Sequence, residues 1–503
     1  MAGALPENAA AARRQLTAGR PALVWRRLVA DTETPVGAAL QLIERGRGDF
    51  LLESVEGGEV RGRYSLLGLD PDLVFRATVH ACEVNRAWRH DRAAFAAQPG
   101  GALAELRALV EACRIEVPEK LPPIACLVGY FGYETIGLVE KLPRAPDSEL
   151  ALPDMLFVRP TTILVFDNLS DELFCIAPLW ADGTDAERAI EAASERIDGA
   201  LRALGAGAPA NARSADLPEL ALTPVMRDGQ YRQMVLKAKD YIAAGDVFQV
   251  VLAQRFTCPF PLPPFALYRA LRRVNPSPFL YFLDLPGFAV VGSSPEILVR
   301  VRDGEITIRP LAGTRPRGAT REEDEEAEAS LLADPKECAE HLMLLDLGRN
   351  DVGRVAAADS VKVTASFTVE RYSHVMHIVS NVVGKLDPAK DALDALFAGF
   401  PAGTVSGAPK VRACEIIAEL EPETRGAYAG GVGYFAPDGS VDSCIVLRTA
   451  VVKDGVMHVQ AGAGIVADSA PASEQRECEA KAGALIAAAR EAVRVAGEPG
   501  FGQ

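Results

Sequence analysis

Apolar runs with little interruption dominate the second half of the chain, and they are typical of strands buried on both faces. The predicted strands lie at 247–256, 279–285, 288–301, 305–311, 432–436, 443–452 and 457–466. Residues 231–247 have the spacing of an amphipathic helix, and a long helical pattern runs from Glu474 to Val495. In the first half, short strand-like runs at 50–54, 71–75 and 161–166 alternate with alanine-rich helical segments. The pattern alone therefore predicts an α/β protein.

The chain divides at Gly205–Pro224, which is rich in alanine, proline and small polar residues and poor in aromatic ones. We predict an N-terminal region at 21–204, a linker at 205–224 and a C-terminal domain at 225–495. Residues 1–20 lack the long apolar segment of a signal peptide and are expected to form a flexible tail.

Charge and cysteine content narrow the possible partners and compartments. The 503 residues carry a formal net charge of −15, which argues against a nucleic-acid surface. No apolar run reaches the roughly 18–20 residues needed to cross a bilayer, so no membrane span is expected. The nine cysteines are scattered without a C-x-x-C pair, which predicts free thiols and a cytoplasmic protein.

Two pairs of glutamates are spaced to share a helix face. In the first pair, Asp334 is a candidate N-cap and Pro335 a candidate first helical residue, followed by Glu337 and Glu340. The spacing of three places both carboxylates on one side of that helix. Such a pair is also common on exposed helices, so it does not by itself indicate a site.

The second pair is Glu474 and Glu477, with Lys481 one turn further along the predicted C-terminal helix. Carboxylates from two such pairs, brought together in one cleft, would repel each other unless a cation lay between them. Oxygen ligands of this kind suit Mg²⁺.

Glycine-rich segments at 310–318, 400–412, 426–435 and 460–466 allow backbone N–H groups to approach an anion closely. None has the spacing of a nucleotide-binding loop, so nucleotide binding is not supported. His374 and His377 form an H-x-x-H pattern without the context of a zinc site, and a structural pair is the simpler interpretation.

Taken together, these segments resemble the chorismate-utilising enzyme family. The resemblance covers roughly Arg232–Ala487. It rests on the ordered motifs PLAGTRPRG, ECAEHLMLLDLGRND, RYSHVMHIVSNVVG, FPAGTVSGAPKVRA, GAYAGGVGYF, CIVLRTA and AGAGIVADS, the last followed by ExxExxxKA. It implies an α/β (α+β) fold with a two-layered β-sandwich core flanked by helices. The segments LLES and GRYSLLG extend the likeness to the branch that forms anthranilate.

The resemblance also assigns roles to individual residues. Glu340 and Glu477 would bind Mg²⁺ directly, with Glu337 and Glu474 supporting it through water, and the metal would hold the ring carboxylate of chorismate. The residues implied to bind the substrate are Gly313, Thr314, Thr404, Tyr428, Arg448, Gly462, Ala463, Gly464 and Lys481. The physical chemistry agrees, since a dicarboxylate needs one metal and one arginine-plus-amide cradle.

By the same resemblance, Glu296 is the general acid that protonates the departing C4 hydroxyl of chorismate. That role needs a carboxyl that stays protonated near neutral pH, as a desolvated site allows. His377 matches the family histidine associated with the later elimination of pyruvate, although its proton-transfer role is left open.

Two positions distinguish the branches of the family. Members that add water carry a lysine base where this chain has Gln249, and aminodeoxychorismate synthases commonly carry a lysine where it has Ala312. Both side chains are chemically inert, so they exclude mechanisms rather than supply one. We therefore expect the conversion of chorismate and ammonia to anthranilate and pyruvate, in tryptophan biosynthesis. The alternatives are an aminodeoxychorismate synthase component and a catalytically inactive chorismate or tryptophan sensor.

The resemblance further implies partners and regulation. No cysteine has the G-x-C-x-G setting of a glutamine amidotransferase, so ammonia comes from solution or from a separate glutamine amidotransferase subunit, in a heterotetramer. The N-terminal region would be regulatory and packed on the catalytic domain, which would bind chorismate. The residues that match the family's pocket for feedback inhibition by tryptophan are Glu53, Ser54, Pro278, Phe279 and Leu280.

Overall fold

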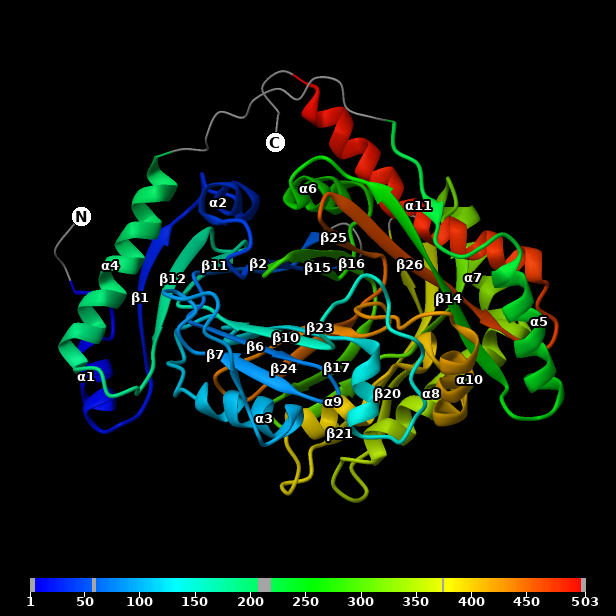
Figure 1. The fold of residues 1–503 in the computed structure, drawn as a ribbon, viewed down its shortest axis with the longest axis horizontal. Coiled ribbons are helices and arrows are strands. Elements are labelled where there is room, and N and C mark those ends of the chain that lie inside the picture. The colour runs from blue at the N-terminus through cyan, green and yellow to red at the C-terminus, as the bar shows by residue number, and fades with distance from the viewer. Residues whose placement is uncertain (1–4, 57–59, 207–218, 373–374, 499–503) are drawn as a thin grey trace.

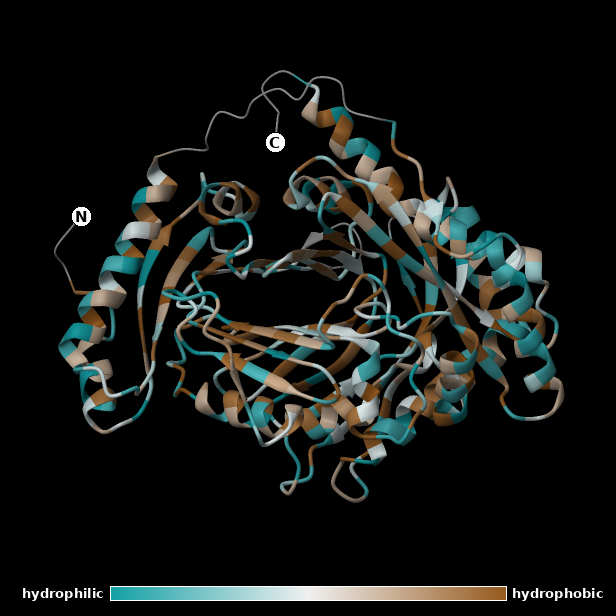
Figure 2. Ribbon diagram, viewed as in Figure 1, coloured by the Kyte–Doolittle hydropathy of each residue, from teal (hydrophilic) through white to brown (hydrophobic). Residues whose placement is uncertain are grey.

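The computed structural model describes residues 5–56, 60–206, 219–372 and 375–498. Two large antiparallel sheets, each with 12 strands, lie one above the other (Figure 1). Helices cover the outer faces, and hydrophobic positions recur along the strands while hydrophilic positions mark the outer helices (Figure 2). The predicted two-layered sandwich flanked by helices is confirmed.

The first sheet contains strands from both parts of the chain. Its order is β1 (Ala22–Val29), β12 (Glu172–Leu179), β11 (Thr162–Asp167), β5 (Tyr64–Leu69), β2 (Asp49–Glu53), β15 (Phe279–Leu285), β16 (Phe288–Ser294), β25 (Thr449–Lys453), β26 (Val456–Ile465), β14 (Gln249–Pro259) and β13 (Thr223–Pro224), with β22 (Gly407–Ala408) paired to β14. The N-terminal region joins the rest where β2 pairs with β15, at Glu53 opposite Leu280.

The second sheet is shared in the same way. Its order is β19 (Leu311–Pro316), β21 (Val375–Lys385), β18 (Glu305–Ile308), β17 (Ile297–Arg302), β24 (Val441–Ile445), β23 (Gly431–Phe435), β9 (Leu127–Phe131), β10 (Met155–Arg159), β6 (Leu73–Ala77), β7 (Cys82–Asn85) and β8 (Ala96–Ala97), with β20 (Lys362–Arg371) paired to β21. A separate ribbon joins β3 (Val55–Glu56) to β4 (Val60–Arg61). The two parts of the chain meet where β9 pairs with β23, so each contributes strands to both layers.

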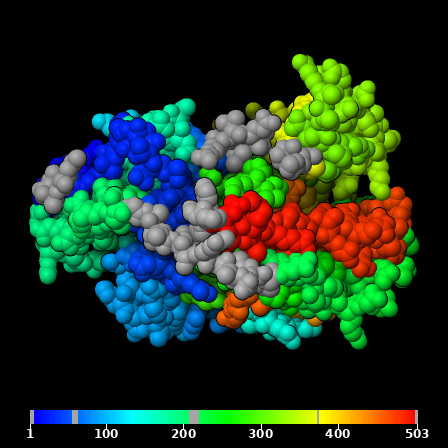
Figure 3. Space-filling model, turned by 90° about the horizontal axis from the view of Figure 1, so that it is seen from above, coloured from blue at the N-terminus to red at the C-terminus, as the bar shows by residue number. Residues whose placement is uncertain are grey.

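Helices cover the two sheets. They are α1 (Ala9–Thr17), α2 (Pro35–Leu42), α3 (Ala102–Ala112), α4 (Ala186–Gly205), α5 (Gln230–Ala243), α6 (Pro264–Val274), α7 (Arg321–Ala333), α8 (Pro335–Gly353), α9 (Ala392–Gly399), α10 (Lys410–Leu420) and α11 (Pro471–Ala496), with 3₁₀ turns η1 (Tyr133–Leu138) and η2 (Gly403–Val405). On the first sheet α4 packs on β12 and α11 packs on β26 and α6, while on the second sheet α8 packs on β19 and β21. Seen from above, α11 lies along one half of the molecule, and the yellow-green segment that includes α7 projects from one side (Figure 3).

Two expectations about local structure are met. Helix α8 begins at Pro335, and the carboxylate of Asp334 accepts hydrogen bonds from the backbone N–H groups of Lys336, at 3.0 Å, and Glu337, at 3.4 Å. All nine cysteines are free, as their spacing predicted. Among the described helices, none combines the length and the apolar character that crossing a membrane requires.

Two other expectations are wrong. The runs at 288–301 and 443–452, each predicted as one strand, are both broken, and each passes from one sheet to the other at the break. The first break falls at Pro295, which has no N–H to donate to a ladder. The second falls before Thr449, where Arg448 takes a left-handed backbone conformation with φ 47°. These crossings place Glu296 and Arg448 between the layers.

Candidate active site

Glu296 lies at the first crossing, between β16 and β17, with 6% of its surface exposed. Its carboxyl oxygen Oε1 accepts a hydrogen bond of 3.0 Å from the Thr404 hydroxyl. Burial raises the pKa of Glu296 to about 8, although the Thr404 hydrogen bond and the charge of Arg448 act in the opposite direction. The carboxyl therefore holds a proton at neutral pH, as the general-acid prediction requires.

Arg448 lies at the second crossing, and its guanidinium is close enough to Glu296 and Tyr372 for both to favour its charged form. Burial nevertheless lowers the pKa of this guanidinium. Within the described part of the chain, no side chain or carbonyl forms an ion pair or hydrogen bond with it. A desolvated cation without a partner is a strong binding group for a carboxylate ligand.

His377 lies on β21 and is also buried, with 5% exposed. Its Nδ1 is 2.9 Å from the carbonyl oxygen of Gly313 and 3.1 Å from the Thr314 hydroxyl. Because a carbonyl can only accept, Nδ1 carries the hydrogen and Nε2 is left with its lone pair. Burial lowers the pKa of His377 to about 4, so the ring is neutral at physiological pH. Its predicted neighbour His374 lies outside the described residues.

The predicted backbone cradle lies on β26, where Gly462, Ala463 and Gly464 pair with β14. Space beside Gly462 is restricted, because a Cβ there would lie 2.9 Å from the Tyr428 hydroxyl oxygen. Lys481 on α11 reaches the same point, and its Nζ donates to the Gly462 carbonyl at 3.0 Å. The structure thus brings these predicted substrate-binding residues together around one stretch of strand.

The carboxylates of α8 are partly exposed and already have partners. Glu340 accepts a hydrogen bond of 3.1 Å from the side-chain amide of Gln249. Glu337 forms an ion pair of 3.1 Å with Arg315. That Gln249 is chemically inert stays a prediction, and the structure adds a contact role, because its amide orients one of the predicted metal ligands.

The carboxylates of α11 are also held by cations. Glu477 pairs with Lys481 at 2.7 Å, and burial together with the charge of Glu477 raises the pKa of Glu474. Lys336 of α8 lies within electrostatic reach of both Glu340 and Glu474, which links the two helices. Across the described ranges, no three His, Cys, Asp or Glu side chains converge at metal-binding distance. The four glutamates have the oxygen donors that Mg²⁺ prefers, but they are not assembled into a site.

The residues predicted to bind an inhibitor line one cavity of about 760 Å³ between the sheets, which also reaches Glu296. They are Glu53, Ser54, Pro278, Phe279 and Leu280. The carboxylate of Glu53 is already engaged, since it accepts hydrogen bonds from Tyr268 at 2.6 Å and from Arg272 at 2.7 Å. Its contribution to the cavity is therefore mainly to hold α6 against β2.

The sequence analysis missed Tyr372, which lies against the site residues. Its ring meets that of His377 edge-on at 5.6 Å between centroids, and it contributes to the electrostatic environment of Arg448. The signal available in the sequence was an aromatic residue five positions before His377, which is too common a pattern to identify a site.

Comparisons with known proteins agree with this geometry. Residues 51–487 match the family described as chorismate binding enzyme. The chain is 54% identical to anthranilate synthase component 1 of Cereibacter sphaeroides, over 96% of this chain and 98% of that protein. It is 47% identical to the protein of that name from Thermus thermophilus, over 92% and 96% of the two chains.

A solved structure is similar over the same extent. The crystal structure of anthranilate synthase component I from Streptococcus pneumoniae superposes with a TM-score of 0.76 at 36% identity, and the match covers 92% of this chain and 99% of that one. The chain therefore belongs to the chorismate binding enzyme family, among the relatives of anthranilate synthase component 1.

Proposed function

We propose that this protein is the chorismate-binding subunit of an anthranilate synthase, which converts chorismate and ammonia to anthranilate and pyruvate with the help of Mg²⁺. The observation that carries the proposal is the group between the sheets: a protonated Glu296, a neutral His377 and an Arg448 that has no ion-pair or hydrogen-bond partner among the described residues. An acid, an anion-binding cation and a base side by side suit an addition–elimination reaction on an anionic substrate. The names of the relatives point to the same reaction.

Binding of the enolpyruvyl carboxylate is assigned to Arg448, Tyr428 and the backbone of 462–464. An unpaired guanidinium gains a charge-assisted hydrogen bond when the carboxylate arrives. The glycines at both ends of the segment allow Tyr428 and Gln249 to lie against the backbone, since a Cβ at Gly462 or Gly464 would collide with those side chains. These groups would hold the substrate before any bond changes, which is the positioning part of catalysis.

Glu296 and His377 are assigned the proton transfers. In the first stage ammonia adds at C2 and the C4 hydroxyl departs as water, taking a proton from Glu296. In the second stage the proton at C2 is removed and the bond from C3 to the enolpyruvyl oxygen breaks. The departing enolpyruvate takes up a proton and becomes pyruvate, the added ammonium gives up a proton to become the amine, and the ring is left aromatic. His377 is suited to accept the C2 proton, because its Nδ1 donates to Gly313 and its Nε2 keeps its lone pair.

Glu340 and Glu477 would hold Mg²⁺, with Glu337 and Glu474 in support. Bound Mg²⁺ would supply positive charge for the ring carboxylate of chorismate. In this role Glu340 stays oriented by Gln249, whereas Glu477 gives up its ion pair with Lys481. That exchange is chemically reasonable, because both glutamates are partly exposed and surface ion pairs stabilise a protein little.

The choice of ammonia follows from the groups that the site lacks. Gln249 cannot act as a base for water, and the buried Ala312 on β19 cannot attack the ring. A separate glutamine amidotransferase would deliver ammonia within a heterotetramer, and tryptophan in the cavity between the sheets would inhibit the reaction. The whole assembly would be cytoplasmic.

Product analysis tests this assignment. The purified chain, incubated with chorismate, Mg²⁺ and an ammonium salt, is expected to form the fluorescent product anthranilate together with an equal amount of pyruvate. Omitting ammonium or adding excess chelator is expected to abolish both products. Formation of aminodeoxychorismate or isochorismate would move the protein to another branch, and no product at all would support a sensor.

A further inference from the structure

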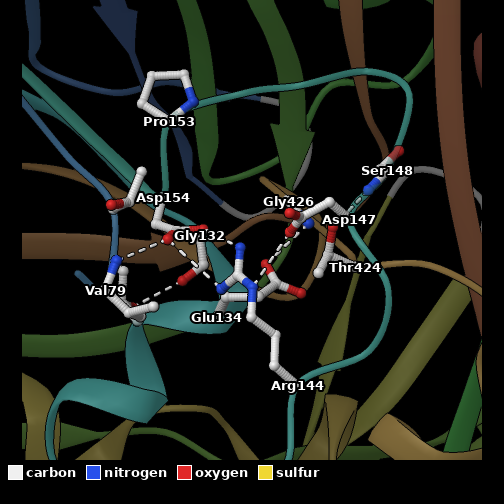
Figure 4. A network of polar contacts seen from close by, with 12 residues as sticks. Val79, Gly132, Glu134, Arg144, Asp147, Ser148, Pro153, Asp154, Thr424 and Gly426 are labelled. Atoms are coloured by element: carbon white, nitrogen blue, oxygen red, sulfur yellow. Dashed lines mark hydrogen bonds and ion pairs between the residues drawn. The ribbon is translucent and has the colours of Figure 1, made fainter. Parts of the chain in front are cut away.

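The loop at 424–430, which carries Tyr428, is held in place by a residue of the N-terminal region. Glu134 lies in η1, and its carboxylate faces this loop within a network of polar contacts (Figure 4). Oε1 accepts a hydrogen bond of 2.7 Å from the backbone N–H of Arg425, and Oε2 accepts one of 3.0 Å from that of Gly426. Both oxygens of one carboxylate thus bind consecutive peptide groups.

The neighbouring backbone strengthens this contact. The N–H of Tyr133 donates to the Gly426 carbonyl at 2.8 Å, so the same loop residue is held through both its donor and its acceptor. Gly426 has φ 60°, a left-handed conformation that suits glycine. The nearby cation Arg144 forms its ion pair with Asp154, at 3.1 Å, and not with Glu134. Burial raises the pKa of Glu134 to about 7, while the N–H of Arg425 and, to a smaller extent, the charge of Arg144 act in the opposite direction. Glu134 is thus held by peptide N–H groups and forms no salt bridge among the described residues.

From this loop, contacts continue to the substrate groups through the fully buried side chain of Arg425. Its guanidinium donates to the carbonyl of Val405 at 2.8 Å and to that of Val251 at 2.7 Å. Val405 follows Thr404, whose hydroxyl binds Glu296, and Val251 pairs with Gly464 of the cradle.

The Arg425 guanidinium also has partners of its own. It forms an ion pair with Glu421, whose other contact is the backbone N–H of Ala253 on β14. It lies over the ring of Tyr428 at 5.6 Å from the centroid and over that of Tyr133 at 4.6 Å. A displacement of the peptide at Arg425 would therefore affect three parts of the pocket: the segment that holds Thr404, the strand beside Gly464 and the ring of Tyr428.

We propose that Glu134 is a positioning residue of the active site: its carboxylate clamps the peptide N–H groups of Arg425 and Gly426, and so holds Tyr428 and the Arg425 guanidinium in the geometry that binds chorismate. The N-terminal region then completes the substrate site as well as lining the cavity between the sheets. This inference rests on the proposed function, because it concerns the same pocket.

Glu134→Gln tests the clamp with little change of volume. A glutamine side chain has one acceptor oxygen. Its NH₂ group would face the peptide N–H that now donates to the second carboxylate oxygen, so that hydrogen bond would be lost. We expect the dissociation constant for chorismate, measured by calorimetry on folded protein, to rise roughly tenfold or more, as for the loss of one charge-assisted hydrogen bond. Glu134→Asp keeps both acceptors on a shorter side chain and is expected to restore part of the affinity.

Glu140→Gln is the matched control, since it makes the same change six residues further on, where the carboxylate meets Arg354 at the surface. Its affinity for chorismate is expected to equal that of the wild type. A purely structural role for Glu134 predicts less folded protein but an unchanged dissociation constant, and that result would overturn the clamp.

A second measurement does not depend on the substrate. Hydrogen exchange of the Arg425 and Gly426 amides is expected to speed up in Glu134→Gln and to stay unchanged in Glu140→Gln. If the wild type failed to bind chorismate, the proposed function would fail, and this exchange would still decide whether the clamp exists. Equal exchange in the wild type and Glu134→Gln would refute it.

Discussion

The space between the sheets and the surface of helices α8 and α11 hold acidic side chains in opposite ways. Between the sheets, Glu296 is buried, hydrogen-bonded to Thr404 and protonated at neutral pH. On the helices, Glu340 and Glu477 are partly exposed and engaged with Gln249 and Lys481. The buried acid already has its proton and its hydrogen bond. The helix glutamates have the oxygen donors that a cation needs, but these donors do not converge on one point.

The difference follows from what desolvation does to charge. A buried carboxyl avoids ionisation by keeping its proton, and in Glu296 the Thr404 hydroxyl donates to one of the two carboxyl oxygens. Several ionised carboxylates that bind one metal ion cannot be buried together when the ion is absent, because they would repel one another strongly. Partial exposure and replaceable partners are therefore what a metal-dependent site requires in its free form.

The largest effect is expected from removing the buried acid. Glu296→Gln keeps the volume and the acceptor for Thr404 but cannot protonate the leaving hydroxyl. We expect kcat for anthranilate formation to fall by roughly 10²–10⁴-fold, as for the loss of a general acid. Chorismate affinity should change little, because Arg448 is intact. A loss of affinity with kcat preserved would assign Glu296 to binding instead.

A smaller loss of activity is expected from changing the glutamates of helices α8 and α11. Glu340→Gln and Glu477→Gln should each weaken the activation constant for Mg²⁺ by more than the roughly 10–100-fold typical of a supporting group. Glu479→Gln is the matched control, because Glu479 lies on the same helix, is exposed like Glu477 and accepts a hydrogen bond from Gln475. Equal Mg²⁺ dependence in all of these proteins would remove the two glutamates from the metal site.

The pH dependence of the wild type gives a third comparison. Because the pKa of Glu296 is raised to about 8, its active form is the protonated one, which predominates below that pH. We expect kcat to fall about tenfold per pH unit above roughly pH 8, as for a single essential acid. A plateau of kcat through pH 10 at saturating Mg²⁺ would show that another group supplies the proton.

The smallest effect is expected from the group that orients a metal ligand. Gln249→Ala leaves Glu340 in place but removes its hydrogen bond. Mg²⁺ activation should weaken by about tenfold, at the lower end of the range for supporting groups. Gln249→Glu places a second negative charge beside Glu340. Comparing its Mg²⁺ activation with that of Gln249→Ala separates the effect of orienting Glu340 from the effect of charge. Unchanged activation in Gln249→Ala would limit this residue to packing.

Much of the fold follows from the apolar runs, and the reason that some of it does not is physical. The runs at 288–301 and 443–452 are largely buried on both sides of their breaks, so the apolar pattern continues across the point where the chain changes sheets. Pro295 was a visible sign of the first break. The residue type at position 448 gave no sign of the second break, because a left-handed backbone conformation favours glycine and the residue there is arginine.

The sequence predicted the site residues that lie in long motifs, and it missed those that are recognised only by a single contact in the folded chain. Glu296, Arg448 and His377 were identified by resemblance, and the structure brings them together between the sheets. Glu134 and its partner loop are separated by about 290 residues along the chain, and the pairing of β9 with β23 brings them together. No local pattern records a contact of that kind.

The most direct test of the account is the rate of anthranilate formation from chorismate and ammonium as Mg²⁺ is raised, compared for the wild type, Glu340→Gln and Glu296→Gln. The account predicts that high Mg²⁺ restores much of the activity of Glu340→Gln, because a weakened cation site fills by mass action. It predicts no recovery for Glu296→Gln, whose missing proton no cation supplies. Recovery of Glu296→Gln with Mg²⁺, or a Glu340→Gln rate that is independent of Mg²⁺, would contradict the distinction between the buried acid and the cation-binding helices.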